Sequence, residues 1–493
     1  MKILFVASEC VPFCKTGGLA DVVGTLPAEL RKRRHDVRVI LPKYKTIRSQ
    51  EFGIKETGES IQIPMGQRVE KADIRVAKTD KGVKVYFVNH DGFFGRAGLY
   101  RTFTGDYADN GERFAFFSRA VFETCKAMEF RPDIISCHDW QTGLVPAYLK
   151  TVYREDAFFQ HTSTVMTIHN MAYQGIFPKT LLPQIGLGWE EFTIDKLEYY
   201  DQINYLKAGL TYSTLLSTVS PTYSHQIQNS YEFGCGLEGT LRKRAGDLVG
   251  ILNGLSPEEW TPEEDPFLPK TYTLDSLSTR KDCKAFLQRE LKLPADPSVS
   301  LLAMVARLDR QKGIDLLIQN LQAILALNTQ VVVLGQGDIF LQGVLEQFER
   351  IYPLAFRVRS DFNDPLAHHI YGGCDIFMMP SRFEPCGIGQ LIAMRYGAVP
   401  VAANTGGLRD TITPVGRNSG TGFLFEAGHA PSFLGAIQEA LRLFSDKESW
   451  ALLQRRAMST DFSWDVSAQT YLHLFWRALG RGTKTRASTK RIS

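Results

Sequence analysis

Short apolar runs alternate with amphipathic helical patterns along most of the chain. In the first half, runs at 3–7, 37–41, 83–88, 134–137, 164–168 and 216–219 predict strands, and 19–33 predicts a helix after the first strand. A strand, a helix and a strand in succession favour a parallel sheet whose two faces are covered. This first series ends near 248–253.

A second series of the same kind begins after residue 297. Runs at 301–305, 331–334, 356–358, 376–379 and 399–402 predict strands, and helical patterns lie at 314–327, 340–352, 365–372 and 387–396. The predicted fold class is therefore α/β, with two Rossmann-like domains facing a central cleft. Ligands of such domains bind beyond the carboxyl ends of the strands, so we expect the site in that cleft.

The same patterns set the expected domain boundaries. The two domains are predicted at 1–253 and 298–460, and the proline-rich, acidic stretch 254–297 reads as a linker with a surface helix. Aromatic residues at helical spacing follow, so 461–480 is expected to be a helix that crosses back to the first domain. Residues 481–493 hold five basic residues and no acidic one, and we expect a disordered tail, with a weak polyanion contact as the alternative.

Composition excludes several classes of protein. The net charge is +4, but without 481–493 it is −1, so the body lacks the basic face of a nucleic-acid binder. No apolar run is long enough to span a membrane, and the chain opens directly as a strand with no basic leader. The eight cysteines form no CxxC pair, which favours reduced thiols. We therefore expect a cytoplasmic protein with neither nucleic acid nor membrane as a partner.

Candidate chemistry follows the first predicted strand. The segment KTGGLAD at 15–21 opens the first helix, and glycine backbone there lets N–H groups approach an anion closely. Lys15 adds a mobile positive charge, although a tight turn with a surface lysine is an equal alternative. The segment is neither the GxGxxG dinucleotide fingerprint nor a P-loop, which weakens the oxidoreductase and kinase interpretations.

The first strand of the second series ends in a similar way. Arg307 and Lys312 stand between the strand 301–305 and the next helix, where two cations can hold a diphosphate and stabilise it as a leaving group. Further strand ends carry Glu384, which could bind sugar hydroxyls or serve as acid, base or nucleophile, and the glycine pair at 406–407. In the first series, HDW at 138–140 and HN at 169–170 each follow a strand.

One motif is missing from the sequence. None of the 27 aspartates forms an Asp-x-Asp pair, the usual metal-diphosphate motif of other sugar-nucleotide transferases. Lys15, Arg307 and Lys312 would then neutralise the diphosphate without an obligatory metal.

Taken together, the motifs resemble the bacterial glycogen synthases, the ADP-glucose-dependent glycogen/starch synthase family of glycosyltransferases. The resemblance covers about residues 1–479 and rests on KTGGLAD (15–21), DYADN (106–110), HDW (138–140), HN (169–170), AYQG (172–175), VSPTY (219–223), GLEG (236–239), NG (253–254), QKG (311–313), SRFEPCG (381–387), TGGL (405–408) and DFSW (461–464).

The resemblance implies a glycosyltransferase B-type fold, no cofactor and no metal site. It implies transfer of glucose from ADP-glucose to the non-reducing end of an α-1,4-glucan, such as glycogen or a maltooligosaccharide primer, with retention of configuration. The implied catalytic residues are Glu384, His169, Arg307, Lys312 and Asp139. The implied ADP-glucose-binding residues are Lys15, Gly17, Gly18, Tyr100, Asn253, Arg307, Lys312, Cys386, Gly387, Thr405, Gly406 and Gly407.

For this family, same-face attack is favoured, with the leaving phosphate accepting the acceptor's proton, and no residue is expected to be a nucleophile. The chain departs from the family pattern at Gln141, at Leu255-Ser256 and at Gly389. The alternatives are a related retaining transferase that uses UDP-glucose or a short maltooligosaccharide acceptor, and a non-catalytic carbohydrate-binding relative. Retention of Lys15, Arg307, Lys312 and Glu384 together argues against a non-catalytic role.

Overall fold

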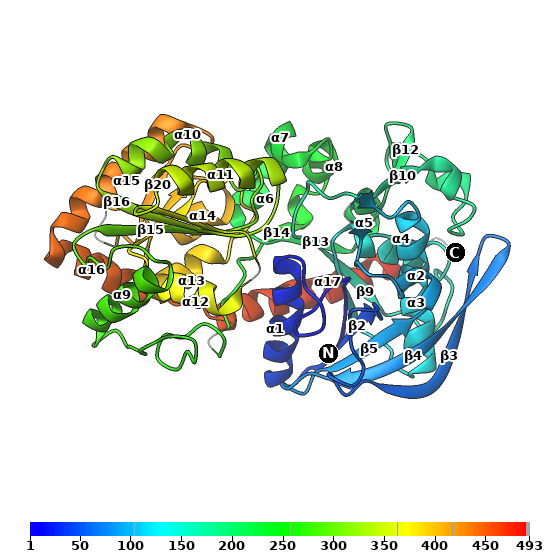
Figure 1. Cartoon of the computed structure of the whole chain (residues 1–493). Helices are drawn as coiled ribbons and strands as arrows, with labels where there is room; N and C mark the ends of the chain where they lie inside the picture. Colours follow the sequence, from blue (N-terminus) through cyan, green and yellow to red (C-terminus); the bar gives the residue numbers. More distant parts are fainter. Residues whose placement is uncertain (103, 257, 362, 417–418, 490–493) are drawn as a thin grey trace. The chain divides into compact units, whose positions relative to one another are not determined.

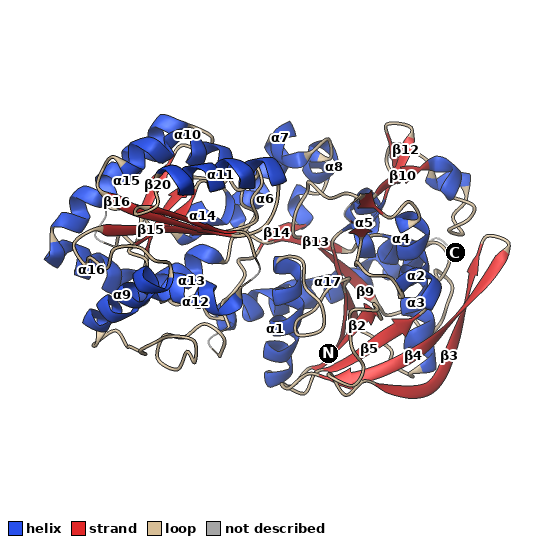
Figure 2. Cartoon of the chain, in the orientation of Figure 1, coloured by secondary structure: helices blue, strands red, loops and turns tan. Residues whose placement is uncertain are grey.

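The structure, a computed structural model, describes residues 1–102, 104–256, 258–361, 363–416 and 419–489, and side chains as far as 481. It divides into two compact units. Unit 1 consists of Met1–Val219, Ser224–Ile251 and the C-terminal segment from Trp464, and unit 2 of Ser220–Tyr223 and Leu252–Ser463. Each unit is an α/β body in which helices flank one main sheet, as Figure 2 shows by colour. Two Rossmann-like domains were predicted, and the fold class is confirmed.

The main sheet of unit 1 has the strand order β14-β13-β9-β8-β1-β2-β5-β4-β3. Seven of its strands are parallel: β1 (Lys2–Val6), β2 (Asp36–Pro42), β5 (Lys84–Asn89), β8 (Ile134–His138), β9 (Ser163–Ile168), β13 (Leu215–Thr218) and β14 (Leu248–Gly250). Six of the seven were predicted as strands, and β14 lies where the first series was expected to end. Counted along the chain, they follow the order 3-2-1-4-5-6-7, which places the reversal of strand order between β1 and β8.

The other two strands, β3 (Lys55–Met65) and β4 (Arg68–Lys78), form an antiparallel hairpin at the edge of this sheet and were not predicted. Only the end of β3 shows strand alternation, with buried Ile61, Ile63 and Met65 separated by exposed residues. The hairpin is visible on the outside of unit 1 in Figure 1. In β4 only Ala72, Ile74 and Ala77 are buried, so most positions of the hairpin carry little hydrophobic signal.

The other elements of unit 1 surround this sheet. The helices are α1 (Gly18–Lys32), α2 (Asp91–Phe94), α3 (Asn110–Ala127), α4 (Leu144–Lys150), α5 (Tyr205–Tyr212), α7 (Tyr231–Gly234), α8 (Glu238–Lys243) and α17 (Trp464–Thr489), while α6 (Pro221–Asn229) spans the boundary of the units. Two small antiparallel sheets are formed by β6 (Arg101–Thr102) with β7 (Gly105–Asp106), and by β10 (Ile176–Pro178), β12 (Gln202–Asn204) and β11 (Glu198–Tyr199).

Helix α17 returns the chain to unit 1 after unit 2 is complete. It packs against α1 and β9, and the Phe475 ring meets the Phe5 ring of β1 edge-on at 6.4 Å. Residues 481–489 are the last part of this helix, and residues 490–493 of the predicted tail lie outside the described residues. No helix in the described part of the chain has the length and apolar character needed to cross a membrane.

Unit 2 has one parallel sheet of six strands in the order β17-β16-β15-β18-β19-β20. The strands are β15 (Ser300–Val305), β16 (Thr329–Leu334), β17 (Phe356–Arg359), β18 (Ile376–Met379), β19 (Val399–Ala403) and β20 (Phe423–Phe425). The helices are α9 (Arg280–Glu290), α10 (Ile314–Leu325), α11 (Ile339–Ile351), α12 (Asp364–Gly373), α13 (Gly389–Arg395), α14 (Gly406–Thr411), α15 (Ala430–Ser445) and α16 (Lys447–Met458). The order 3-2-1-4-5-6 again reverses between the first and fourth strands, here β15 and β18.

Candidate active site

The sequence-predicted site residues fall into two groups, one in each unit. In unit 1, Lys15, Gly17 and Gly18 follow β1, Asp139 follows β8 and His169 follows β9. In unit 2, Arg307 and Lys312 follow β15, while Glu384 follows β18 and Thr405 follows β19. Each group therefore gathers at the carboxyl ends of the central strands, where the strand order reverses.

A buried carboxylate that was not predicted organises the loop after β1. Glu9 is 4% exposed and accepts hydrogen bonds from the Thr16 hydroxyl at 2.6 Å and from the backbone N–H groups of Thr16 and Gly17, the latter at 3.3 Å. These two N–H groups lie at the N-terminus of α1, where negative charge is favoured. The anion that they bind in this structure is therefore Glu9.

Tyr100 is part of the same cluster. Its hydroxyl lies 2.6 Å from Glu9 Oε1 and 2.7 Å from Ser8 Oγ. Burial, reinforced by the negative charge of Glu9, raises the pKa of the phenol well above its usual value, so Tyr100 stays protonated and can donate a hydrogen bond. Tyr100 thus ties the β1 loop to a segment about ninety residues away along the chain.

Lys15 stands on the solvent side of this loop. Its ammonium lies 2.7 Å from Asp21 Oδ1 on the first turns of α1, and 46% of the Lys15 side chain is exposed. Burial raises the pKa of the Asp21 carboxyl, and the nearby Lys15 lowers it. An exposed ion pair of this kind contributes little to stability, so Lys15 can exchange Asp21 for an anionic ligand at small cost.

Asp139 is held in a strained conformation directly after β8. Its φ of 56° and ψ of −177° lie in a region that residues other than glycine rarely adopt, and such strain is characteristic of functional sites. Its Oδ1 accepts the backbone N–H of His169 at 2.7 Å. Burial raises the pKa of the carboxyl to about 7, although the N–H groups of His169 and Asn170 oppose that shift.

His169 belongs to a chain of polar side chains that leads into the sheet. Its Nε2 lies 2.9 Å from His138 Nδ1, and His138 Nε2 lies 3.1 Å from Ser136 Oγ. The His138 ring is fully buried and stacks on Phe5, with ring centroids 5.5 Å apart. Burial lowers the pKa of His169 to about 3, and burial beside His169 lowers the pKa of His138 as well. Both rings are therefore neutral at physiological pH.

In unit 2, the loops after β15 and β18 meet through an ion pair. Lys312 Nζ donates to Glu384 Oε2 at 2.6 Å, and Ser381 Oγ donates to the same oxygen at 3.0 Å. Only 6% of the Glu384 side chain and 19% of the Lys312 side chain are exposed. Removing one partner of such a buried pair leaves the other charge uncompensated, which makes the pair a strong constraint on both loops.

Arg307 lies at the exposed end of the same loop. Its guanidinium is 3.4 Å from Asp309 Oδ2 and 3.4 Å from Gln311 Oε1. Asp309 Oδ1 in turn accepts the Lys312 backbone N–H at 2.9 Å. One aspartate thus orients both cations, and about half of the Arg307 side chain remains accessible to a ligand.

Two glycines allow these loops to approach one another closely. A Cβ on Gly313 would lie 1.8 Å from the Pro380 carbonyl oxygen, and a Cβ on Gly406 would lie 1.9 Å from the Glu384 carbonyl oxygen. Both residues have positive φ, at 73° and 44°. The Gly407 N–H also donates to the Glu384 carbonyl at 3.1 Å. Glycine is therefore required where the loops after β15 and β19 pack against the loop after β18.

Asn253, Cys386 and Gly387 complete the second group. Asn253 is 6% exposed, and within the described structure its Oδ1 is a buried oxygen without a hydrogen-bond partner. Burial raises the pKa of the Cys386 thiol to about 12, although the Asn253 backbone lowers it, so the thiol stays protonated. Gln390, which was not predicted, closes this loop by donating to the carbonyls of Cys386 at 3.1 Å and Gly387 at 3.0 Å.

The three departures from the family pattern lie beside these groups. Gln141 is 7% exposed, in the turn after Asp139. Ser256 donates to Glu258 at 2.8 Å, next to buried Leu255. Gly389 begins α13, where a Cβ would lie 3.2 Å from the Phe377 ring. None of the three contacts the Lys312–Glu384 pair in the described structure.

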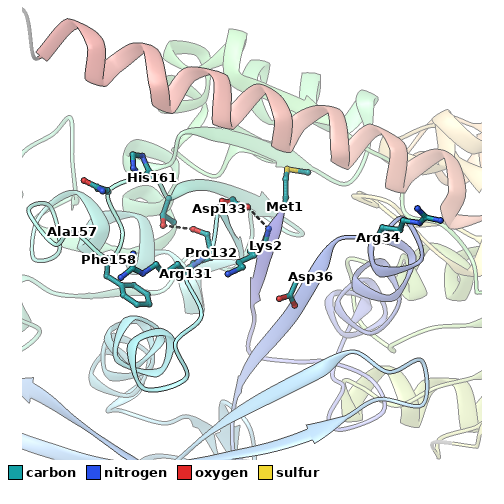
Figure 3. Close-up of a pocket in the computed structure, with 12 residues that line it drawn as sticks. Met1, Lys2, Arg34, Asp36, Arg131, Pro132, Asp133, Ala157, Phe158 and His161 are labelled. Atoms are coloured by element: carbon teal, nitrogen blue, oxygen red, sulfur yellow. Dashed lines mark hydrogen bonds between the residues drawn. The ribbon is translucent and has the colours of Figure 1, made fainter.

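A cavity of about 540 Å³ lies at the opposite edge of the unit 1 sheet (Figure 3). Lys2, Arg34, Asp36, Arg131 and Asp133 are among its lining residues, at or near the starts of β1, β2 and β8. None of the predicted site residues lines it. Among the residues that the structure describes, no cluster of three or more His, Cys, Asp or Glu side chains could hold a metal ion.

Comparison with known proteins assigns this arrangement to a family. The starch synthase catalytic domain family matches residues 2–243, and glycosyl transferases group 1 matches residues 288–451. Glycogen synthase 2 of Geobacter sulfurreducens is 46% identical over 477 residues, covering 96% of this chain and 98% of that protein. Glycogen synthase of Syntrophotalea carbinolica is 44% identical over 484 residues, covering 97% and 99%.

Solved structures agree with the sequence relatives. The catalytic domain of starch synthase IV from Arabidopsis thaliana, bound to ADP and acarbose, is 32% identical with a TM-score of 0.90, covering 97% of this chain and 99% of that one. Sucrose-phosphate synthase from Thermosynechococcus elongatus, at 18% identity and a TM-score of 0.61 over 97% and 99% of the two chains, shares the fold alone. The chain therefore has the glycosyltransferase B fold and belongs to the glycogen/starch synthase family of glucosyltransferases.

Proposed function

We propose that this protein transfers glucose from ADP-glucose to the 4-hydroxyl at the non-reducing end of an α-1,4-glucan, with retention of configuration. The observation that carries the proposal is the cluster at the strand-order reversal of unit 2, where Arg307, Lys312 and Glu384 stand together. A related enzyme has been solved with ADP and acarbose, a nucleoside diphosphate and an oligosaccharide analogue.

Arg307 and Lys312 would hold the diphosphate. Both project from the loop after β15, and a nearby aspartate orients them. Negative charge grows on the leaving phosphate as its bond to the sugar breaks, so fixed cations stabilise the transition state more than the ground state. Lys15 with the backbone of Gly17 and Gly18 would add to this binding, as would the N-terminus of α14 through Thr405, Gly406 and Gly407.

Glu384 would bind hydroxyl groups of the donor glucose. Lys312 and Ser381 both donate to its Oε2, which leaves Oε1 as the carboxylate oxygen that can accept from a sugar. The backbone of Cys386 and Gly387 lies beside it, and the buried Oδ1 of Asn253 supplies an acceptor without a protein partner in the described structure. A sugar hydroxyl would satisfy that oxygen, whose burial is otherwise unfavourable.

Apart from the β1 loop that carries Lys15, the unit 1 group suits the sugar and the acceptor better than the diphosphate. His169 and His138 are neutral because burial lowers the pKa of each ring, and the Tyr100 hydroxyl remains protonated. Neutral donors and acceptors can orient hydroxyl groups without opposing the positive charge that develops on the sugar. Asp139, held next to His169, would accept a hydrogen bond from the glucan when it is ionised.

The chemical step then needs no covalent enzyme intermediate. The bond from C1 of glucose to the phosphate oxygen breaks, the acceptor 4-oxygen bonds to C1 on the same face, and the hydroxyl proton passes to the leaving phosphate. Glu384 is engaged by Lys312, and the Cys386 thiol is protonated, so neither is arranged as a nucleophile. The alternatives are UDP-glucose as donor, a short maltooligosaccharide as the natural acceptor, or a non-catalytic carbohydrate-binding role.

The test is incorporation of radiolabelled glucose into glycogen. The purified chain is incubated with glycogen and either ADP-glucose or UDP-glucose, in the presence of EDTA, and label is counted in precipitated polymer. We expect label mainly from ADP-glucose, undiminished by EDTA. Label mainly from UDP-glucose would overturn the donor assignment. Absence of label from both donors, in a protein that still binds ADP, would favour the non-catalytic alternative.

A further inference from the structure

One cavity of unit 1 lies away from the candidate active site and is not used by the proposed function. Its volume is about 540 Å³, and the space lined by the twelve residues drawn in Figure 3 is defined here as the basal cavity. Lys2 begins β1, Asp36 begins β2 and Asp133 directly precedes β8. The basal cavity therefore lies where these parallel strands begin, whereas the candidate site residues follow the ends of strands. Its volume is typical of sites for small molecules.

Three cations line the basal cavity without forming an ion pair among the described residues. They are Lys2, Arg34 and Arg131, and all three residues are exposed. Figure 3 shows Lys2 between the other two, with Arg131 on one side and Arg34 on the other. A ligand could therefore approach three positive charges without first displacing a carboxylate from any of them.

The two carboxylates of the basal cavity are already engaged by other groups. Asp133 Oδ2 accepts the backbone N–H of Lys2 at 2.6 Å. Asp36 Oδ2 lies 3.2 Å from a guanidinium nitrogen of Arg38, which does not line the cavity. The charged side chains of the lining are three positive and two negative, and Arg38 neutralises one of the negative charges. This excess of positive charge favours an anionic ligand.

The guanidinium of Arg131 is held in place before any ligand binds. It lies over the Phe158 ring, 4.9 Å from the ring centroid, and Figure 3 shows the two side chains together. The Phe158 N–H donates to Asp156 Oδ1 at 2.9 Å, and Asp156 pairs with Lys126 at 2.7 Å. A cation that is already ordered loses less conformational freedom when it binds an anion.

Arg34 occupies a backbone position that favours glycine. It follows Arg33, the C-cap of α1, and its φ is 65°. The His35 N–H donates to the Leu30 carbonyl at 3.4 Å, which is the longer hydrogen bond of a Schellman motif. Glycine is the usual residue at the position of Arg34 in this motif, because a side chain is strained there. An arginine at such a position indicates a role for its side chain.

We propose that the basal cavity binds a small molecule that carries phosphate groups, at a site separate from the loops that would bind the donor. Phosphate oxygens match the paired N–H groups of a guanidinium, which Arg34 and Arg131 supply, and Lys2 adds a mobile positive charge. The three cations stand at separate points of the cavity. A molecule with more than one anionic group therefore fits them better than a single phosphate ion.

The distribution of charge favours a small ligand over a nucleic acid at this site. A nucleic acid needs positive charge along a face of the protein, because each phosphate that is contacted adds to the affinity. Without residues 481–493 the chain has a net charge of −1. The cations of the basal cavity are therefore a local feature of a nearly neutral body.

Three continuous elements connect the basal cavity with the candidate site residues of unit 1. Strand β1 leads from Lys2 to the loop of Glu9, and β8 leads from Asp133 to Asp139. Helix α1 begins in the glycine loop of the candidate site and ends beside Arg34. Since a ligand in the cavity would contact the other ends of these elements, we expect it to change the affinity of the protein for ADP.

The test is a calorimetric titration of inorganic pyrophosphate into the full-length protein, at low ionic strength and with saturating ADP. ADP occupies the proposed donor site, so the remaining binding reports the basal cavity. We expect one such site, whose affinity falls as salt is added. The double variant Lys2→Gln with Arg131→Gln should bind pyrophosphate about tenfold more weakly, because it removes two charged hydrogen-bond donors. Asp36→Asn should bind it severalfold more tightly, because it removes a negative charge from the cavity.

Lys32→Gln is the matched control for the loss of a positive charge. Lys32 is an exposed cation at the end of α1 that pairs with Glu29 and does not line the cavity. Its removal should leave pyrophosphate binding within about twofold of the wild-type value. All of the substituted residues are exposed, so thermal unfolding should show that each variant remains folded.

Three outcomes would contradict the proposal or a part of it. Absence of pyrophosphate binding in the presence of ADP, or equal binding by the wild-type protein and the double variant, would overturn the site. Equal affinity for citrate would overturn the assignment to phosphate in favour of a general anion site. An ADP affinity that pyrophosphate shifts equally in the wild-type protein and in the double variant would overturn the coupling. None of these measurements needs glucosyl transfer, so failure of the proposed function would be seen separately.

Discussion

The two units place their candidate site residues at the same reversal of strand order, but the charges of those residues differ. In both, site residues follow the first and fourth parallel strands, on either side of the reversal of strand order. In unit 1 the buried carboxylate Glu9 is bound by backbone N–H groups and a tyrosine hydroxyl. In unit 2 the equally buried Glu384 is bound by the ammonium of Lys312. Apart from the exposed Lys15, the site in unit 1 therefore presents neutral hydrogen-bonding groups, and the site in unit 2 presents cations.

This difference shows that the fold supplies a position and the loops supply the chemistry. A nucleoside diphosphate needs fixed positive charge, which the β15 loop combines with a buried counter-ion. A sugar that develops positive charge is better served by neutral imidazoles and a protonated phenol, which unit 1 provides. The following predictions test that division of labour, beginning with the largest expected effect.

Alanine at Arg307 or at Lys312 should have the largest consequence. We expect kcat for glucosyl transfer to fall by about 10²–10³ in either variant, because each removes a charge that we propose stabilises the leaving diphosphate. Arg310→Ala is the matched control, since Arg310 is an exposed arginine of the same loop. It should retain activity within about twofold. Near-normal turnover in both Arg307→Ala and Lys312→Ala would contradict the role assigned to unit 2.

His138 should act as a positioning residue for His169. His138→Gln removes the ring that holds His169 Nε2 at 2.9 Å, and we expect kcat to fall about tenfold to a hundredfold with little change in the KM for ADP-glucose. Ser136→Ala, one step further along the chain of contacts, should give a smaller loss. If both variants lost thermal stability and the loss of kcat followed that loss of stability, a packing role would be indicated instead. Imidazole nitrogen chemical shifts would report directly whether His169 keeps its neutral tautomer.

Asp139 should govern the acidic side of the pH profile. Burial raises the pKa of the Asp139 carboxyl to about 7. We therefore expect kcat/KM to fall as pH drops below 7, because the Asp139 carboxylate becomes protonated and no longer accepts a hydrogen bond from the glucan as an anion. Asp139→Asn should flatten that limb while lowering the maximum severalfold. Asparagine tolerates positive φ, so the variant should keep the loop conformation. A wild-type profile that is flat from pH 5 to 8 would contradict the assignment.

The contrast between the units also explains what could be read from the sequence. The strands following one another at βαβ spacing, and the cations directly after 301–305, were visible because each signal is local. Arg307 and Lys312 are five residues apart and oriented by Asp309, which lies between them. The residues that give the unit 2 site its positive charge therefore lie in one short segment of the sequence.

The site of unit 1 was harder to predict from the sequence, because it depends on contacts between residues that are far apart along the chain. Glu9 gains its role from Tyr100, 91 residues away, and His138 gains its role from His169, 31 residues away. Neither pairing leaves a spacing signal, although an acidic residue at a strand end beside a glycine loop was a clue to Glu9. The β3–β4 hairpin was missed for a different reason, since most of its residues face solvent.

A further expected effect lies in the pH dependence of stability, where His169 and Asp139 act in opposite directions. The folded-state pKa of His169 is lowered from 6.5 to about 3, so between those values the unfolded chain binds a proton that the folded chain does not. This group therefore lowers the free energy of unfolding as pH falls from 6.5. The pKa of Asp139 is raised from 3.8 to about 7, so in that range the folded chain binds the extra proton. That group lowers the free energy of unfolding as pH rises.

Urea unfolding at several pH values between 4 and 6.5 separates the two contributions. Relative to the wild-type protein, His169→Asn should lose less stability on acidification, and Asp139→Asn should lose more, each by up to about 1.4 kcal/mol per pH unit. Arg310→Ala should leave the slope unchanged. Slopes that move in the same direction in both asparagine variants would mean that at least one of the two groups is not held in the protonation state that burial in unit 1 imposes.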